Sequence, residues 1–365
     1  MRVLVLASCR WLNAAVEGAL LQARALACAG VETAFAGTPG SPAMIEAVRH
    51  GIRCLPLRLE GWSFPMGLSA LRGICREFAP DFVCAHRSED HTAAVLLDPC
   101  PVVRVRSDIR RPVAGRAAAW VDGRTSLVVV PSGFMVREGY LSRRRGASEI
   151  IPQPVDTARF APPAGRPEGV VVSAGRLSEV KGHRTLIRAV ACLPGVRAVI
   201  AGAPAQQSVE DLRSFAAGLG AAERIEFPGR LEDMPAFYSG GTLGVVASLG
   251  SEAVSRAAAE MMASGLPVLA AATNGLVDLV ADGRTGLLHP PGDWRTLSLQ
   301  IRHLLDNPGA AAYLSTNARE FCEREISIVA VGGKWLSVLE GLRRGNKATR
   351  ERVSLTEGTG NPSEG

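Results

Sequence analysis

Short apolar runs alternate with amphipathic stretches along most of the chain. The runs are rich in β-branched residues and carry no regular polar alternation, which is typical of strands buried on both faces of a parallel sheet. Strands are predicted at 3–8, 31–37, 82–86, 101–106, 126–132, 170–177, 197–202, 224–229, 243–248 and 267–271. Helical patterns lie between them, as at 14–29 and 41–50. The pattern therefore predicts an α/β protein.

The alternation pauses once, at ARFAPPAGRPEG (158–169), where Pro and Gly prevent regular structure. We therefore expect two doubly wound parallel-sheet domains, 1–163 and 164–322, that face each other across a cleft. Ligands of such sheets bind at the carboxyl ends of the strands, here inside that cleft. Within 323–344, a helix is predicted to cross back to the N-terminal domain, and the polar tail 345–365 is predicted to be disordered.

The positive charge is confined to one half of the chain. Residues 1–165 hold 20 Arg, no Lys and 14 acidic residues, so the whole net charge of +6 belongs to them. This favours an anionic partner, such as a phosphorylated glycolipid or an acidic membrane surface, with solvated arginines as the alternative. Nucleic acid is not expected, because aromatic content is only 5% and no basic patch is interleaved with aromatic residues.

The remaining bulk features exclude several classes of protein. The eight cysteines are scattered without a CxxC pair, which favours reduced thiols and a cytoplasmic location over a disulfide framework or a metal site. No apolar run reaches the roughly 18 residues of a membrane span. Neither predicted domain start carries the GxGxxG motif, so the sequence does not favour a dinucleotide-dependent oxidoreductase. No cofactor is expected, and no acidic pair follows a strand to suggest a metal.

Two carboxylates eight residues apart stand out in GSEAVSRAAAEMMASGLPV (250–268), which ends in a helix-stopping Gly-Leu-Pro. If a helix begins near Ala253, Val254 or Ser255, the free amides and positive dipole end of that helix can hold a diphosphate. Glu252 would then contact hydroxyls on one side of the phosphates, and Glu260, roughly 12 Å along the helix, those on the other. The alternative is a helix cap and a solvated surface acid.

Two cations follow a predicted strand in AGRLSEVKG (174–182). Arg176 and Lys181 at a strand's carboxyl end suit a pyrophosphate, Arg by bidentate contact and Lys as a point charge. They could neutralise a departing nucleotide diphosphate without a metal. The alternative is a structural turn with solvated cations.

Another pair lies in AHRSEDH (85–91), after a strand predicted to face the cleft. His86 could orient the acceptor or the donor sugar, and Asp90 or Glu89 could accept a proton. The alternative for His86 is a hydrogen-bonded structural histidine.

The C-terminal half resembles retaining glycosyltransferases of family 4, which have the GT-B fold of two Rossmann-like domains. The resemblance is carried by AGRLSEVKG, by the Glu-x7-Glu segment with its MASGLPV stop, and by VDLVADGRTGLLHPPGD (277–293), in that order across roughly 170–300. The N-terminal half matches more loosely, at 80–90, 128–135 and 151–160.

The resemblance implies a nucleotide diphosphate-sugar donor and a glycan or glycolipid acceptor, as in cell-envelope polysaccharide or lipopolysaccharide synthesis. It implies front-face transfer in which the leaving phosphate helps to deprotonate the acceptor. Carried over to this sequence, Glu252 binds donor-sugar hydroxyls and Glu260 the ribose. Arg176, Lys181 and the amides of Ala253 to Ser255 hold the diphosphate.

The N-terminal half departs from the family pattern at three places. Leu-Asn-Ala-Ala replaces the usual Gly-Gly turn at 12–15, Gln-Pro-Val-Asp replaces Asn-Gly-Val-Asp at 153–156, and Ser107 stands where a histidine is common. Two other functions therefore stay open, a sugar-nucleotide epimerase on the same fold and a catalytically idle GT-B-like subunit that binds a partner.

Overall fold

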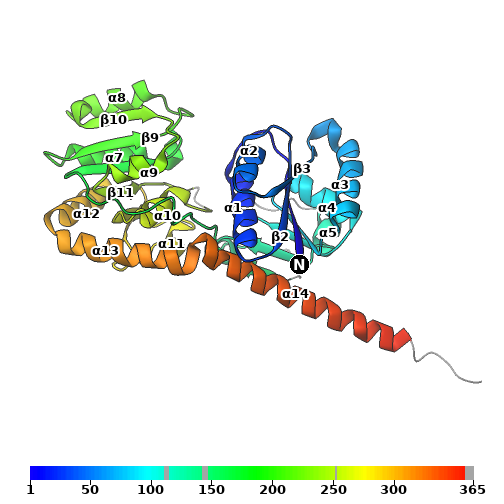
Figure 1. Ribbon diagram of the computed structural model, residues 1–365. Coiled ribbons are helices and arrows are strands. Elements are labelled where there is room, and N and C mark those ends of the chain that lie inside the picture. Colours follow the sequence, from blue (N-terminus) through cyan, green and yellow to red (C-terminus); the bar gives the residue numbers. More distant parts are fainter. Residues whose placement is uncertain (111–114, 142–146, 251–252, 358–365) are drawn as a thin grey trace, which may run out of the picture.

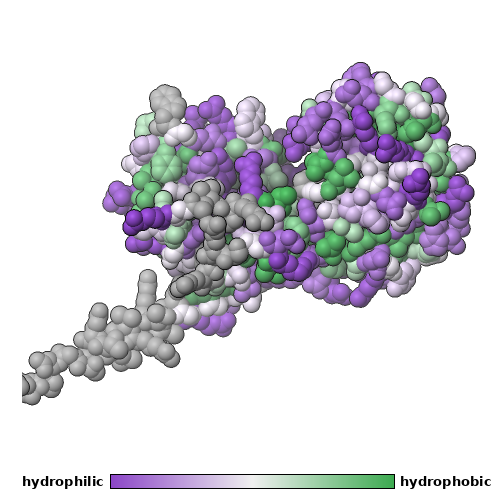
Figure 2. All heavy atoms as spheres, turned by 180° about the vertical axis from the view of Figure 1, so that it is seen from behind, coloured by the Kyte–Doolittle hydropathy of each residue, from purple (hydrophilic) through white to green (hydrophobic). Residues whose placement is uncertain are grey.

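The computed structural model describes residues 1–110, 115–141, 147–250 and 253–357, without the side chains of Trp62 and 346–357. Two parallel sheets form two domains, and helices cover both faces of each sheet (Figure 1). Seen from behind, the domains are two lobes with an indentation between them at the upper edge (Figure 2). The prediction of two doubly wound α/β domains is confirmed.

The N-terminal sheet has seven parallel strands in the order β3-β2-β1-β4-β5-β6-β7. The strands are β1 (Arg2–Ala7), β2 (Glu32–Gly37), β3 (Arg53–Pro56), β4 (Phe82–Ala85), β5 (Val102–Val105), β6 (Leu127–Val130) and β7 (Ser148–Ile150). The helices are α1 (Ala14–Cys28), α2 (Pro42–Arg49), α3 (Phe64–Phe78), α4 (Ser88–Leu97), α5 (Arg116–Gly123) and α6 (Gly133–Arg137). Along β1, Val3 and Val5 enter one apolar cluster and Leu4 and Leu6 the other, so both faces are buried.

The C-terminal sheet has six parallel strands in the order β10-β9-β8-β11-β12-β13. The strands are β8 (Val170–Ala174), β9 (Arg197–Ala201), β10 (Ile225–Gly229), β11 (Leu243–Val246), β12 (Val268–Ala271) and β13 (Leu287–His289). The helices are α7 (His183–Ala191), α8 (Val209–Ala217), α9 (Met234–Ser239), α10 (Arg256–Ala263), α11 (Leu276–Leu279), α12 (Trp294–Asp306) and α13 (Pro308–Phe321). Three short strands, β3, β7 and β13, had no counterpart among the predicted runs.

The last helix, α14 (Ile328–Glu357), leaves the C-terminal domain and runs beneath the N-terminal one (Figure 1). Its Ile328, Val331, Trp335 and Leu339 recur at helical spacing and belong to the apolar cluster that α1 and β1 form. We expected disorder from residue 345, but the helix continues to Glu357, and 358–365 lie outside the described residues. The boundaries at 163 and 322 stay predictions.

Candidate functional site

The order of the C-terminal sheet reverses between β8 and β11, and the loops after these strands lie where open parallel sheets bind their ligands. The first loop passes through Gly182, which has φ +68°, and a Cβ there would lie 1.9 Å from the carbonyl oxygen of Ala247. The amide of Leu249 donates to the carbonyl of Val180 at 2.8 Å. The two loops that carry the predicted donor residues are therefore tied together.

Arg176 and Lys181 both lie in the first loop. The Arg176 side chain is exposed, whereas that of Lys181 is half-buried. The Lys181 stem passes Gly175, with its Cδ 3.5 Å from the position of a Cβ there. His183, which is buried, meets the carbonyl of Arg176 through Nε2 at 3.0 Å and so holds the backbone of this loop. The structure brings both cations to the strand edge, as the sequence suggested.

The second loop leads into α10, which begins at Arg256 with Ser255 as N-cap. Ala253 and Ser255 are buried and Val254 is half-buried, and none of the three lies in the helix. Glu252 lies outside the described residues. The helix thus begins one residue after the predicted range 253–255, where the chain is not helical, so eight helical residues do not separate the two acids. The rise of roughly 12 Å that we derived from that helix does not apply.

Glu260 is not a solvated surface acid, since its side chain is 12% exposed. The hydroxyl of Tyr238 donates to its Oε2 at 3.0 Å, and Nε of Arg256 lies 3.6 Å from its Oε1. Burial raises the pKa of Glu260, and the charge of Arg256 partly offsets this. Arg256 also forms an ion pair with Glu17 of α1, so one guanidinium joins the two domains at this acid.

A small cavity of about 60 Å³ lies beside Glu260, between the domains. It is lined by α1, by the segment 153–160 that links the domains, and by α10 with the loop before it: Glu17, Leu21, Arg24, Gln153, Pro154, Val155, Asp156, Arg159, Phe160, Val254, Arg256, Ala259 and Glu260. Sequence reasoning missed Tyr238, Arg256 and Glu17, because their partners are remote in the chain. The one sequence signal was Arg256 itself, which stands four residues after Glu252 and four before Glu260.

The N-terminal sheet reverses between β1 and β4, and His86 follows β4 at that point. We predicted that His86 faces the cleft, but it is 4% exposed. Its Nε2 lies 2.6 Å from Oε1 of Gln22 on α1, while Nδ1 has no hydrogen-bond partner. Burial, with a smaller contribution from Arg104, lowers its pKa to about 3. His86 is therefore a neutral, positioned imidazole near neutral pH.

Asp90 was also predicted to face the cleft, and it is fully buried instead. Its Oδ2 accepts the amide of Ser8, which follows β1, at 3.1 Å, and Oδ1 has no partner. Burial raises the pKa of Asp90 to about 7, against the lowering effect of Arg87 and of the Ser8 amide. This buried carboxylate links the end of β1 to α4, and it cannot contact an acceptor substrate in this conformation.

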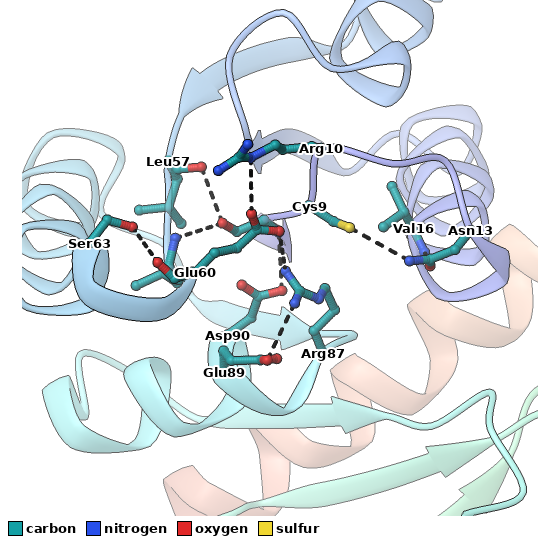
Figure 3. Close-up of polar contacts among 12 residues, drawn as sticks. Cys9, Arg10, Asn13, Val16, Leu57, Glu60, Ser63, Arg87, Glu89 and Asp90 are labelled. Atoms are coloured by element: carbon teal, nitrogen blue, oxygen red, sulfur yellow. Dashed lines mark hydrogen bonds and ion pairs between the residues drawn. The ribbon is translucent and has the colours of Figure 1, made fainter.

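An ionic cluster lies at the same edge of the sheet, as Figure 3 shows. Nη1 of Arg87 bonds to Oε1 of Glu60 at 3.2 Å, Nη2 of Arg87 lies 3.4 Å from Glu89, and Nε of Arg10 lies 3.5 Å from Glu60. The Glu89 side chain is 48% exposed, so it presents an accessible carboxylate here, unlike Asp90. Sequence reasoning named Glu89 as an alternative base but missed Arg10 and Glu60.

The described residues contain neither a cluster of metal ligands nor a membrane-spanning helix. Among them, no group of three or more His, Cys, Asp or Glu side chains is placed to hold a metal ion. Within the same residues, none of the helices combines the length and apolar character that crossing a membrane requires.

Comparison with known proteins places this geometry in context. Residues 155–321 match the family model of glycosyl transferases group 1. The D-inositol 3-phosphate glycosyltransferase of Mycobacterium sp. (strain KMS) is 40% identical over 135 residues, 35% of this chain and 30% of that protein. The lipopolysaccharide core biosynthesis glycosyltransferase LpsE of Rhizobium meliloti (strain 1021) is 30% identical over 199 residues, 54% and 56% of the two chains. The matches thus span about a third of the mycobacterial relatives and about half of LpsE.

Solved structures extend the likeness to the whole fold. Anabaena Alr3699/HepE in complex with UDP gives a TM-score of 0.80 at 20% identity, covering 93% of this chain and 100% of that one. A glycosyltransferase from Rickettsia africae ESF-5 gives 0.81 at 17% identity, covering 93% and 98%. At these identities the likeness concerns the fold, which is the GT-B arrangement of two Rossmann-like domains.

Proposed function

We propose that this protein is a retaining glycosyltransferase that moves a sugar from a nucleotide diphosphate-sugar to a glycan or glycolipid acceptor. The GT-B fold and the match of residues 155–321 to glycosyl transferases group 1 support the reaction class. The chain resembles family 4 in its motifs, which supports the retaining outcome. Because HepE has been solved with UDP and with UDP-glucose, UDP-sugars are the first donors to test.

One observation carries the proposal. The loop with Arg176 and Lys181 and the loop that enters α10 meet at the point where the C-terminal sheet reverses, tied by the contacts of Gly182 and Leu249. Two cations and the backbone amides of the adjoining loop suit a diphosphate, which carries its charge on several oxygens. An open sheet binds its ligand at this place.

The roles that we propose within the site are those that the resemblance to family 4 implies. Arg176, Lys181 and the amides of Ala253, Val254 and Ser255 hold the diphosphate. Glu260 binds the ribose hydroxyls and Glu252 those of the donor sugar. For a ribose to reach Glu260, it must share or replace the contact of that carboxylate with Arg256.

In the transfer step the bond between the anomeric carbon and the diphosphate oxygen breaks while the acceptor oxygen bonds to the same face of that carbon. The acceptor proton passes to the departing phosphate oxygen, and the charge left on the diphosphate is neutralised by Arg176 and Lys181 without a metal. His86 supports the acceptor side as a neutral positioning group. Asp90 can accept a proton only in a conformation that exposes it at the edge of the N-terminal sheet. Glu89, beside it, is the accessible carboxylate.

The acceptor and the location are also part of the proposal. LpsE is named for lipopolysaccharide core biosynthesis, which favours a cell-envelope glycan or glycolipid acceptor. The arginine excess of residues 1–165 would attract the anionic face of the cytoplasmic membrane, where such acceptors lie. We therefore expect a cytoplasmic enzyme that binds this membrane peripherally, without a nucleic-acid partner.

The test is a screen of UDP, GDP, ADP and their sugars by thermal shift and by donor turnover. A ligand that binds the native state raises its melting temperature. Release of free sugar, or its transfer to a glycan, supports the transferase. An isomerised donor would instead identify an epimerase, and absence of binding to all donors an idle subunit.

Two near-isosteric variants separate the roles of the two acids. Glu260→Gln should weaken the nucleotide diphosphate and its sugar by comparable factors, because both carry the ribose. Glu252→Gln should leave the affinity for the bare diphosphate nearly intact and lower turnover, because its partner exists only in the sugar. Calorimetry and initial rates measure both effects, with melting curves as a check on folding. Loss of diphosphate binding in Glu252→Gln alone would reverse the assignment.

A further inference from the structure

The donor loop, which joins β11 to α10, packs against the N-terminal domain. Ala253 is buried in an apolar cluster whose other buried members, Val128, Val130 and Met135, come from β6 and α6. The hydroxyl of Ser132 donates to the carbonyl of Ala253 at 3.4 Å, and both residues are buried. The N-terminal domain therefore contacts the donor loop directly, through the segment that follows β6.

Asp278 of α11 holds this segment from the other domain. Its Oδ2 accepts the amide of Phe134 at 2.6 Å, and its Oδ1 accepts Nη2 of Arg137 at 2.6 Å. The Phe134 amide lies in the first turn of α6, where backbone amides have no hydrogen-bond acceptor within their own helix. One carboxylate thus caps a helix of the other domain and forms a charge-assisted bond with it.

The surroundings are shaped for this contact. At Gly133, a Cβ would lie 2.8 Å from Nη1 of Arg137 and 3.6 Å from Oδ1 of Asp278, so a side chain there would displace the arginine. Asp278 also follows Asn274, whose Nδ2 donates to the carbonyl of Gly250 at 2.9 Å. The segment 274–278 therefore touches the start of the donor loop on one side and α6 on the other.

We propose that Asp278, Arg137 and the Phe134 amide form an interdomain clamp that seats the N-terminal domain on the donor loop, which makes Asp278 a positioning residue for transfer. The assignment to transfer rests on the proposed function, whereas the clamp itself is a property of the domain pair. Asp278 touches neither Arg176 nor Lys181 in any described contact, so the clamp acts by geometry and not by binding the nucleotide.

The experiment compares Asp278→Ala, Asp278→Asn and Arg137→Ala in the full chain. The matched control is Arg53→Ala, which removes an ion pair with Glu77, also 2.6 Å long, that lies within the N-terminal domain. Asp278→Ala should lower kcat roughly tenfold, as expected for losing bonds to a charged group, and change the affinity for UDP less than twofold. Asp278→Asn retains an acceptor for the Phe134 amide and should lose less. Arg137→Ala should have no further effect in the Asp278→Ala background, because both act through one contact.

A readout without catalysis separates this proposal from the proposed function. Small-angle scattering of the unliganded protein should give a larger radius of gyration for Asp278→Ala than for wild type and Arg53→Ala. Equal radii, fully additive effects of Arg137→Ala and Asp278→Ala, or a loss of kcat matched by an equal loss of UDP affinity would each overturn the clamp. If wild type has no transferase activity but Asp278→Ala still opens it, the clamp stands and the proposed function fails.

Discussion

Arg256 changes the interpretation of the Glu-x7-Glu segment more than any other single residue. Its guanidinium contacts Glu260 and Glu17, so the acid predicted to bind ribose is already engaged, and by a group that also joins the domains. Glu260 is shielded from water and bonded to Tyr238 as well. A ligand at this acid therefore rearranges existing charge pairs instead of meeting a free carboxylate.

The phosphate site allows a prediction for Lys181. Lys181→Ala should weaken the binding of a nucleotide diphosphate by roughly 1.5–3 kcal/mol, as for a hydrogen bond to a charged group. Binding of the nucleoside should barely change, because it lacks the phosphates. Isothermal titration calorimetry with both ligands measures the difference. Equal losses for the two ligands would remove Lys181 from the phosphate site.

Asp90 predicts a pH dependence of stability. Its folded-state pKa is raised from 3.8 to about 7, mainly by burial, so ionisation costs more in the folded protein than in the unfolded chain. The wild type should therefore lose stability as pH rises from about 4 to about 7. Asp90→Asn retains an acceptor for the Ser8 amide without the charge.

Chemical denaturation at pH 4.5 and pH 8 tests this expectation. Asp90→Asn should be stabilised relative to wild type at pH 8 more than at pH 4.5, by about 1.4 kcal/mol for each pKa unit. A difference for Asp90→Asn that does not vary with pH would mean that the buried carboxyl does not titrate in this range.

At the scale of the elements, the contact between α14 and α1 fixes the C-terminal helix to the N-terminal domain. A Cβ at Gly332 would lie 2.2 Å from the carbonyl oxygen of Ala25, so the two backbones approach closely there. At Gly333 no heavy atom lies within 4 Å of the corresponding position. Adjacent glycines of one helix therefore have opposite environments.

These two positions give a matched prediction. Gly332→Ala should destabilise the protein by about 1–3 kcal/mol, because a backbone atom blocks the methyl group. Gly333→Ala should be neutral or stabilising by up to about 1 kcal/mol, since alanine favours helix. Thermal or urea unfolding of both variants measures the difference. Equal stabilities would show that α14 does not pack on α1 at this crossing.

At the scale of the whole molecule, charge and architecture divide along the same line. The domain with the seven-stranded sheet carries the arginine excess, and the other domain carries the predicted donor loops. The contacts of Asp278 and Arg256 join these halves. In the proposed reaction, donor and acceptor meet where the halves face each other.

The charge excess predicts salt-dependent membrane binding. The protein should co-sediment with vesicles rich in phosphatidylglycerol and not with phosphatidylcholine vesicles. Binding should fall as salt rises from about 0.05 to 0.3 M, because screening shortens the reach of the arginines. Co-sedimentation that is independent of lipid charge would leave the arginines as solvated surface residues.

The sequence by itself determined the local structure. All ten predicted apolar runs contain a strand, since a strand buried on both faces needs contiguous apolar residues. The helix that contains Glu260 ends at Ala263, before Gly265 with φ +68°, as the Gly-Leu-Pro stop predicted. The pairing of Arg176 with Lys181 in one loop was also evident, because a loop keeps neighbours in sequence together.

Only the tertiary structure decided the strand order, with its reversals at β8/β11 and β1/β4, and the burial of His86 and Asp90. It also decided that Arg256 meets Glu17 and that Asp278 caps α6. Each of these contacts joins residues that are more than 140 positions apart in the sequence. Such contacts depend on how the two sheets pack. Local patterns record which faces are apolar, but which charged side chains meet depends on the relative position of domains that fold around separate cores.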